Sequence, residues 1–114
     1  MSAAGFTWGL SATLAVIGGK WKPLILFQLS RGQSRYGALK RAVEGVSDKM
    51  LIQQLKELQA DGVVDRKDYQ QVPPKVEYAL TPFGETLAKA LGPLCTWGAD
   101  HMDEIERLVA RRAT

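Results

Sequence analysis

The chain has 114 residues, of which 46% are hydrophobic and 24% charged, a composition that fits one folded domain and excludes a disordered or collagen-like chain. Its single cysteine excludes an intrachain disulfide, and no apolar run approaches the length required to cross a bilayer. No basic segment precedes the apolar stretch near the N-terminus, as it would in a signal peptide. We therefore expect one cytoplasmic domain over residues 1–114, with no membrane contact.

The formal net charge of +3 is distributed unevenly. Residues 1–57 contain eight lysines and arginines against three acids, whereas residues 58–114 contain seven against nine. An excess of positive charge in the first half favours an anionic partner there, and double-stranded DNA is the commonest candidate.

Two apolar helices are predicted at the start of the chain. Residues 10–17 carry apolar side chains at steps of three and four, and a Gly-Gly pair ends this segment. A second, strongly apolar helix has Pro23 in its first turn and runs to about Leu29.

The next two predicted helices form a helix-turn-helix. Ser34 is positioned to cap a helix over residues 34–44, and Ser47 to cap another over residues 47–61. The turn between them is short and contains Gly45. Two helices joined in this way are typical of DNA-binding proteins, in which the second helix enters the major groove.

After Gly62 the apolar period changes from helical to alternating, which predicts two strands joined by a polar, proline-bearing tip. Residues 63–80 thus predict a wing. The last region, residues 82–112, is predicted to be helical with a kink or break at Gly92-Pro93. The predicted fold class is mainly α with a small β-hairpin: a winged helix-turn-helix with additional N- and C-terminal dimerisation helices.

One face of the helix over 47–61 is polar and lies opposite its leucines. Lys49, Gln53 and Lys56 point together there, with Met50 beside them. Glutamine can bond an adenine edge, lysine can bond guanine, and an apolar group can touch a thymine methyl. These four residues are therefore candidates for base readout, against the alternative that the face is simply solvated.

Phosphate or wing contacts are expected from a second set of residues with hydroxyl, phenol or cationic side chains. Tyr36 either reaches a phosphate or packs against the domain. The set is Ser34, Arg35, Tyr36, Ser47, Arg66, Lys67 and Lys75.

Apolar residues continue at steps of three and four through the last region, beyond what one small core can cover. A second copy of the chain would most simply bury them across a two-fold axis. We expect a homodimer, whose two recognition helices would meet half-sites about 34 Å apart in a (pseudo)palindromic operator. The predicted interface comprises Leu10, Leu14, Leu94, Trp97, His101, Ile105 and Leu108.

Catalysis and cofactor binding have no support in the sequence. No nucleophile, base and acid occur in a recognisable arrangement, and His101 lacks the companion ligands of a metal site. Catalytic residues, metal ligands and cofactors are therefore not expected. The alternative to a DNA-binding regulator is a winged-helix module for protein–protein interaction without specific DNA binding.

Three separated segments carry a resemblance to a known family: "IGGKWKPLIL", "RYGALKRAVEGVSDKMLIQQLKELQADGVVDR" and "VPPKVEYALTPFG". They resemble the HxlR-type winged helix-turn-helix transcriptional regulators of bacteria and archaea. The resemblance implies a homodimeric DNA-binding regulator, with residues 47–61 in the major groove and 63–80 as the wing. It also implies a possible response to oxidants, electrophiles or other small molecules.

The chain departs from this family at one point. Redox-sensing members commonly carry a cysteine about ten residues ahead of the Gly-Gly-Lys-Trp motif, where this sequence has Trp8. The thiol switch is therefore not carried over, and a non-covalent small-molecule effector is the better expectation. Cys95 is interpreted as a buried, apolar-like cysteine.

Overall fold

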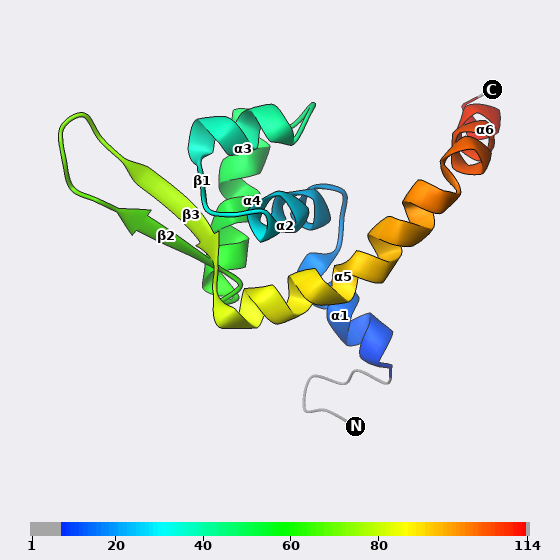
Figure 1. Cartoon of the computed structure of the whole chain (residues 1–114), viewed down its shortest axis with the longest axis horizontal. Coiled ribbons are helices and arrows are strands. Elements are labelled where there is room, and N and C mark those ends of the chain that lie inside the picture. Colours follow the sequence, from blue (N-terminus) through cyan, green and yellow to red (C-terminus); the bar gives the residue numbers. More distant parts are fainter. Residues whose placement is uncertain (1–7, 114) are drawn as a thin grey trace.

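The computed structural model describes residues 8–113, and its elements form a winged helix-turn-helix with a helix added at each end (Figure 1). This confirms the predicted mainly α fold class. The helices are α1 (Gly9–Ile17), α2 (Trp21–Ser30), α3 (Tyr36–Ala42), α4 (Asp48–Ala60), α5 (Pro82–Asp100) and α6 (Met102–Arg112). The strands are β1 (Ser34–Arg35), β2 (Val64–Asp68) and β3 (Val76–Leu80).

The core lies where α2, α3 and α4 pack together with the base of the wing. Helix α4 contributes the fully buried Leu51, Leu55 and Leu58 from one face, as their spacing predicts. Ser47 caps this helix by accepting a hydrogen bond from the Met50 amide at 3.1 Å. The position and tilt of α4 are thus set by burial on one face and by a cap at its start.

The sheet has three antiparallel strands in the order β1-β3-β2, one more than predicted. Ser34 was predicted to cap α3, and this is wrong, because it lies in β1 and pairs with Tyr78 of β3. Helix α3 begins two residues later, and no side chain caps it. The physical reason is that β2 pairs with only one edge of β3. The two extended residues of β1 supply hydrogen-bond partners to the backbone of the other edge of β3.

Of the predicted kink or break at Gly92-Pro93, the break is wrong, because α5 continues through Pro93 to Asp100. Proline removes one donor from the helix, but here it lies on an exposed side where water can bond the freed carbonyl. The helix ends at Asp100, and His101 is its C-cap. The ring nitrogen Nδ1 of His101 donates to the Trp97 carbonyl at 2.9 Å, and the backbone N–H of His101 donates to the Gly98 carbonyl.

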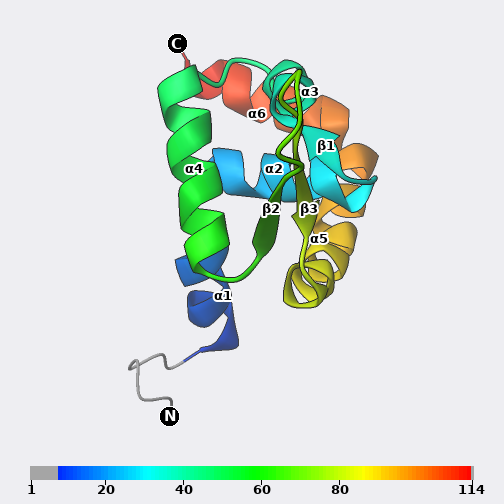
Figure 2. The ribbon, with the colours of Figure 1, turned by 90° about the vertical axis from the view of Figure 1, so that its left-hand side faces the viewer.

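The last two helices extend away from the core (Figure 1). The radius of gyration is 16.0 Å, compared with about 13 Å for a compact domain of this length. Helix α6 has no buried residue. Figure 2 shows α4 standing beside the wing, with α1 at one end of the molecule.

Within residues 8–113, no single helix has both the length and the apolar composition needed to cross a membrane. Helices α1 and α2 meet that test only as a pair, and they are bent by 85° at the break between them.

Several hydrogen bonds around Thr81 hold the base of the wing close to the start of α5. The Thr81 hydroxyl donates to the Gly62 carbonyl at 2.6 Å and accepts from the Gly84 amide at 2.9 Å. The Thr81 amide donates to the Val63 carbonyl at 3.1 Å. Gly84 is buried so closely against this carbonyl that a Cβ there would lie 2.0 Å from the Val63 oxygen. Only glycine fits without moving the backbone.

Candidate nucleic-acid interface

The exposed face of α4 presents three of the four residues predicted to read bases. Lys49, Gln53 and Lys56 are exposed on the side opposite the buried leucines. Met50 is half-buried and packs against the core, and its sulfur accepts a hydrogen bond from Gln54 at 3.5 Å. Of the four, Met50 therefore has the least side chain free for a partner.

A chain of polar contacts that the sequence did not reveal links α2 to this face. The Lys22 ammonium lies 2.8 Å from Glu57 Oε1, and the Gln53 amide donates to Glu57 Oε2 at 3.2 Å. Hydrogen bonds from Lys22 and then from Gln53 hold the pKa of Glu57 below its usual value. The spacing of 53 and 57 is a helical i,i+4 pair, which could have been recognised. Lys22 lies 35 residues away in sequence, and nothing in its neighbourhood marks it as a partner of α4.

Tyr36 ties the start of α3 to the start of α4. Its hydroxyl donates to Asp48 Oδ1 at 2.5 Å, and its ring packs against the core. Partial burial, followed by the hydrogen bond to Asp48, raises the pKa of Tyr36 to about 12. Because the hydroxyl proton is committed to Asp48, a phosphate could receive it only if this bond were broken.

From the raised pKa of Tyr36 we predict that the protein loses stability at alkaline pH. The folded-state pKa of Tyr36, about 12, lies above the value of 10.0 for an unperturbed tyrosine. Its stabilisation is therefore complete below pH 10 and is lost as the pH rises towards 12. Urea unfolding of the parent and of Tyr36→Phe should give free energies whose difference shrinks over this range. Tyr69 has a raised pKa as well and occurs in both proteins, so the difference isolates Tyr36. A difference independent of pH would contradict the assignment.

The wing groups its cations around one aromatic ring. The ammonium groups of Lys67 and Lys75 lie 4.6 and 4.3 Å from the centroid of Tyr69. Lys75 also lies 3.4 Å from Glu77 Oε1. The Tyr69 hydroxyl, then Lys75 and Arg35, lower the pKa of Glu77. Glu77 thus offsets part of the positive charge around Tyr69. Across residues 63–80 the three cations are matched by Asp65, Asp68 and Glu77, so the positive charge of the wing is local to this ring rather than a net excess.

Three further phosphate candidates lie just before α3 and α4 in the chain. Arg35 is exposed at the β1–α3 junction, where its Cα pairs with Glu77, and exposed Ser47 has its side-chain oxygen engaged in the cap of α4. Ser34 is half-buried in β1, and its hydroxyl donates to the Gly32 carbonyl at 3.4 Å. Both hydroxyls therefore already have roles within the fold.

A groove of about 380 Å³ runs between α4 and the wing. Its lining includes Lys56, the predicted wing residue Arg66 and the exposed apolar Ile52, which the sequence did not single out. Two cations from separate elements therefore face the same groove. This arrangement can accept an anionic backbone lying along α4.

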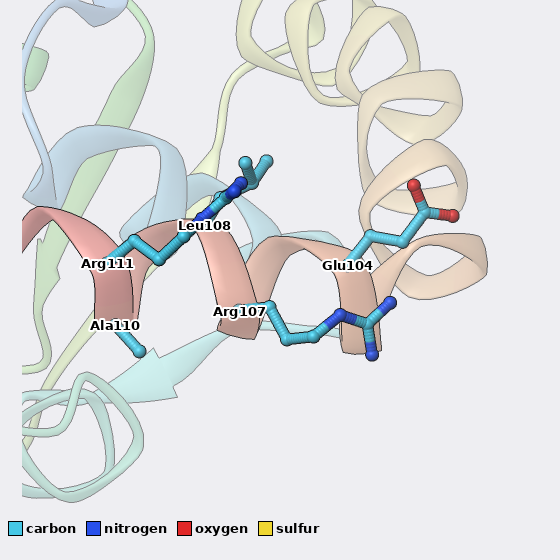
Figure 3. A pocket seen from close by; sticks show the side chains of 5 residues that line it. All are labelled: Glu104, Arg107, Leu108, Ala110 and Arg111. Carbon is cyan, nitrogen blue, oxygen red and sulfur yellow. The ribbon is translucent and has the colours of Figure 1, made fainter.

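The residues predicted for a dimer interface lie on α1, α5 and α6, far from the wing (Figure 1). Most are exposed: Leu10, Leu14, Leu94, Trp97 and Leu108, whereas His101 and Ile105 are half-buried. The His101 ring stacks on Trp97 with centroids 4.9 Å apart. Leu108 borders a shallow hollow along α6, beside Glu104 and Arg107 (Figure 3).

An apolar groove of about 480 Å³ lies between α1, α2 and α5. Leu14, Phe27 and Leu94 contribute to its lining, and Cys95 lies at its edge. The interpretation of Cys95 as buried is wrong, since the thiol is exposed. The thiol borders this groove from α5, and the described residues leave it exposed there. Trp8 is exposed at the start of α1.

Among residues 8–113, no group of three or more histidine, cysteine, aspartate or glutamate side chains could hold a metal ion.

Comparison with known proteins matches this architecture to one family. Residues 16–106 match the sequence profile described as HxlR-like helix-turn-helix. The uncharacterized HTH-type transcriptional regulator YtcD of Bacillus subtilis is 52% identical over 96 residues, which cover 84% of this chain and 76% of that protein. A crystal structure of YtcD superposes with a TM-score of 0.77 at 50% identity, covering 85% of this chain and 99% of the YtcD chain.

A second structural relative is the redox regulator HypR in its reduced form. It superposes with a TM-score of 0.81 at 42% identity, covering 88% of this chain and 99% of the HypR chain. The profile match spans more than half of the chain and confirms the resemblance found in its sequence motifs. The chain belongs to the HxlR-like helix-turn-helix family, whose relatives found here are transcriptional regulators rather than enzymes.

Proposed function

We propose that the chain is a cytoplasmic, sequence-specific transcriptional regulator that binds a (pseudo)palindromic DNA operator as a homodimer, with α4 in the major groove. The observation that carries this proposal is the exposed polar and basic face of α4 beside a cation-bearing wing. A protein-binding helix would instead favour an apolar or aromatic anchor at its centre. Family membership supports the same reading.

Base readout is assigned to Gln53 and Lys49, with Lys56 towards the wing and Met50 in a lesser role. Gln53 lies at the middle of the exposed face, directly opposite the buried leucines, where a groove floor would be approached most closely. Arg35, Lys67 and Lys75 are assigned to phosphates, as is Arg66 in the groove beside α4. Tyr36 and Ser47 act mainly by holding the start of α4 in place.

The homodimer is supported by the apolar side chains that α1, α5 and α6 leave uncovered. Leu10 of α1 is 70% exposed and Leu94 of α5 is 64% exposed. Contiguous apolar surface of this kind marks an interaction site. A two-fold dimer would place two copies of α4 on successive half-sites.

The apolar groove beside Cys95 is assigned to the second copy rather than to an effector. It is open, and apolar side chains and glycines dominate its lining. A small-molecule site would normally add a few convergent polar groups that orient the ligand. A small-molecule effector, if the protein uses one, would then act at a surface that the dimer creates.

Replacing Gln53 by Ala should weaken operator binding by about 1–3 kcal/mol and relax the preference at one base pair, because a bidentate base contact is lost. Replacing Arg35 by Gln should instead weaken binding to operator and scrambled duplexes alike and lower the salt slope by about one unit. Both effects can be measured in one salt titration on the two duplexes.

Gln59→Ala is the matched control for the base-reading variant. Gln59 lies on the same helix, but its amide donates to the Leu55 carbonyl at 3.1 Å and is thus used locally. It should leave the base preference unchanged. If Gln53→Ala loses affinity equally for both duplexes, Gln53 does not read sequence. If the parent prefers no duplex at all, the protein-interaction alternative is favoured instead.

A further inference from the structure

We propose that Lys22 and Glu57 are positioning residues that fix the side-chain amide of Gln53 so that it reads an adenine. This inference rests on the proposed function, in which Gln53 faces the bases. It adds two residues to the recognition machinery, the buried Lys22 of α2 and the half-buried Glu57 of α4, and specifies the base that they favour.

The direction of the amide follows from the chemistry of its partner. An ionised carboxylate can only accept hydrogen bonds. The Gln53 atom 3.2 Å from Glu57 Oε2 must therefore be the nitrogen, and the amide oxygen must face away. The other carboxylate oxygen, Oε1, is occupied by the Lys22 ammonium at 2.8 Å. Both oxygens of Glu57 thus have a fixed partner.

Lys22 is the buried residue at one end of the series of contacts Lys22–Glu57–Gln53. It belongs to α2 beside the buried Ile25 and Leu26, and its side chain is only 11% exposed. Glu57 is its only ion-pair partner among the described residues, and a buried ammonium without such a partner would be costly. The Glu57 side chain is 43% exposed, so without Lys22 its carboxylate could turn into solvent. The ammonium therefore holds the carboxylate, and the carboxylate holds the amide.

The groups left free on Gln53 determine what it can read. Once one N–H is bonded to Glu57, the amide retains its oxygen as an acceptor and one N–H as a donor. Adenine offers the complementary pair in the major groove, the N6 donor and the N7 acceptor. A free amide can turn over and present donor and acceptor in the opposite order, so it would discriminate less.

The contact between Lys22 and Glu57 also removes a repulsion between Glu57 and the DNA phosphates. Glu57 lies one turn from Gln53 on a helix that would approach phosphates, and an uncompensated carboxylate there would repel them. Lys22 neutralises this charge from inside the domain, so that the cations of the exposed face remain free for DNA. The depressed pKa of Glu57 is consistent with a carboxylate that stays ionised.

The test uses the full-length protein and a set of operators in which each base pair is changed in turn. The variant is Lys22→Met/Glu57→Leu, which removes both charges together and leaves neither one buried alone. The matched control is Lys20→Met, because Lys20 is exposed and its ammonium lies over the Trp21 ring, without a contact to Glu57. Urea unfolding checks that each variant folds.

The parent should favour adenine by at least about fivefold at one position per half-site. The double variant should lose most of that preference while its salt slope and its affinity for scrambled duplex stay within about twofold. Lys20→Met should keep the preference. A merely structural role would lower affinity for all duplexes together and leave the profile unchanged, which would overturn the inference.

Gln53→Ala separates failure of this inference from failure of the proposed function. If Gln53→Ala abolishes the adenine preference and the double variant does not, Gln53 reads the base without help, and only the positioning role is wrong. If neither the parent nor any variant distinguishes one duplex from another, the proposed function fails, and this inference fails with it.

Discussion

Replacing Gly84 by Ala is expected to lower the free energy of unfolding by about 2–4 kcal/mol. The added Cβ would lie 2.0 Å from the Val63 carbonyl oxygen and 3.0 Å from its carbon. This carbonyl cannot easily move, because it accepts from the Thr81 amide and leads directly into β2. Relief would require α5 to separate from the base of the wing. Against a typical total stability of about 5–15 kcal/mol, the loss is large.

Gly98→Ala is the matched control for this substitution. Gly98 lies in the same helix, and a Cβ there would meet nothing within 4 Å. Because alanine has the higher helix propensity, this variant should be unchanged or more stable by up to about 1 kcal/mol. Urea unfolding of the three proteins measures both effects. Equal stability of Gly84→Ala and the parent would show that the contact between α5 and the base of the wing yields readily.

Local pattern was sufficient to predict the elements that belong to one helix or one hairpin. Helix α4 has its leucines at helical spacing and a serine before its first turn, and both signals lie within the segment itself. The alternating residues around β2 and β3 likewise predicted the wing. These features depend on neighbours in sequence, so the sequence could show them.

The errors occurred where distant parts of the chain decide the local structure. Ser34 is a good capping residue, yet the unpaired edge of β3 draws it into a strand. Pro93 is a helix breaker, yet it lies where α5 can tolerate it. Cys95 resembles a core residue, yet α5 extends beyond the core and exposes it. For Ser34 the competing interaction is pairing with β3, and for Pro93 and Cys95 the deciding fact is that α5 is exposed there. The local pattern shows neither.

The candidate site divides in the same way. The exposed residues of α4 could be named from helical geometry alone, since a face opposite a buried stripe is exposed. Their support could not, because the Lys22–Glu57 and Tyr36–Asp48 contacts join residues on different helices. Sequence thus indicated which side chains of α4 are exposed, and the fold shows which contacts orient them.

Replacing Leu108 by Glu should convert the proposed dimer to a monomer and weaken operator binding by about 100-fold, because the second half-site then no longer binds intramolecularly. Leu108 lies on the apolar side of α6, and burying a carboxylate there in an apolar contact would be unfavourable. The fold itself should persist, since no residue of α6 is buried in the core. Analytical ultracentrifugation and DNA titration at fixed salt measure the two effects.

Ala110→Glu introduces the same charge on the same helix. Both residues border the hollow along α6, but Figure 3 shows Ala110 pointing to the side of the helix opposite Leu108. This control therefore adds the charge off the apolar side and should remain dimeric with parental affinity. A duplex carrying one half-site separates loss of dimerisation from loss of the DNA-binding surface. Parent and Leu108→Glu should bind it equally, because α4 and the wing lie at the other end of the molecule. If Leu108→Glu remains a dimer, α6 is not the interface. If it is a monomer that binds the full operator as tightly as the parent, one copy reads the operator alone, and the two-fold arrangement is wrong.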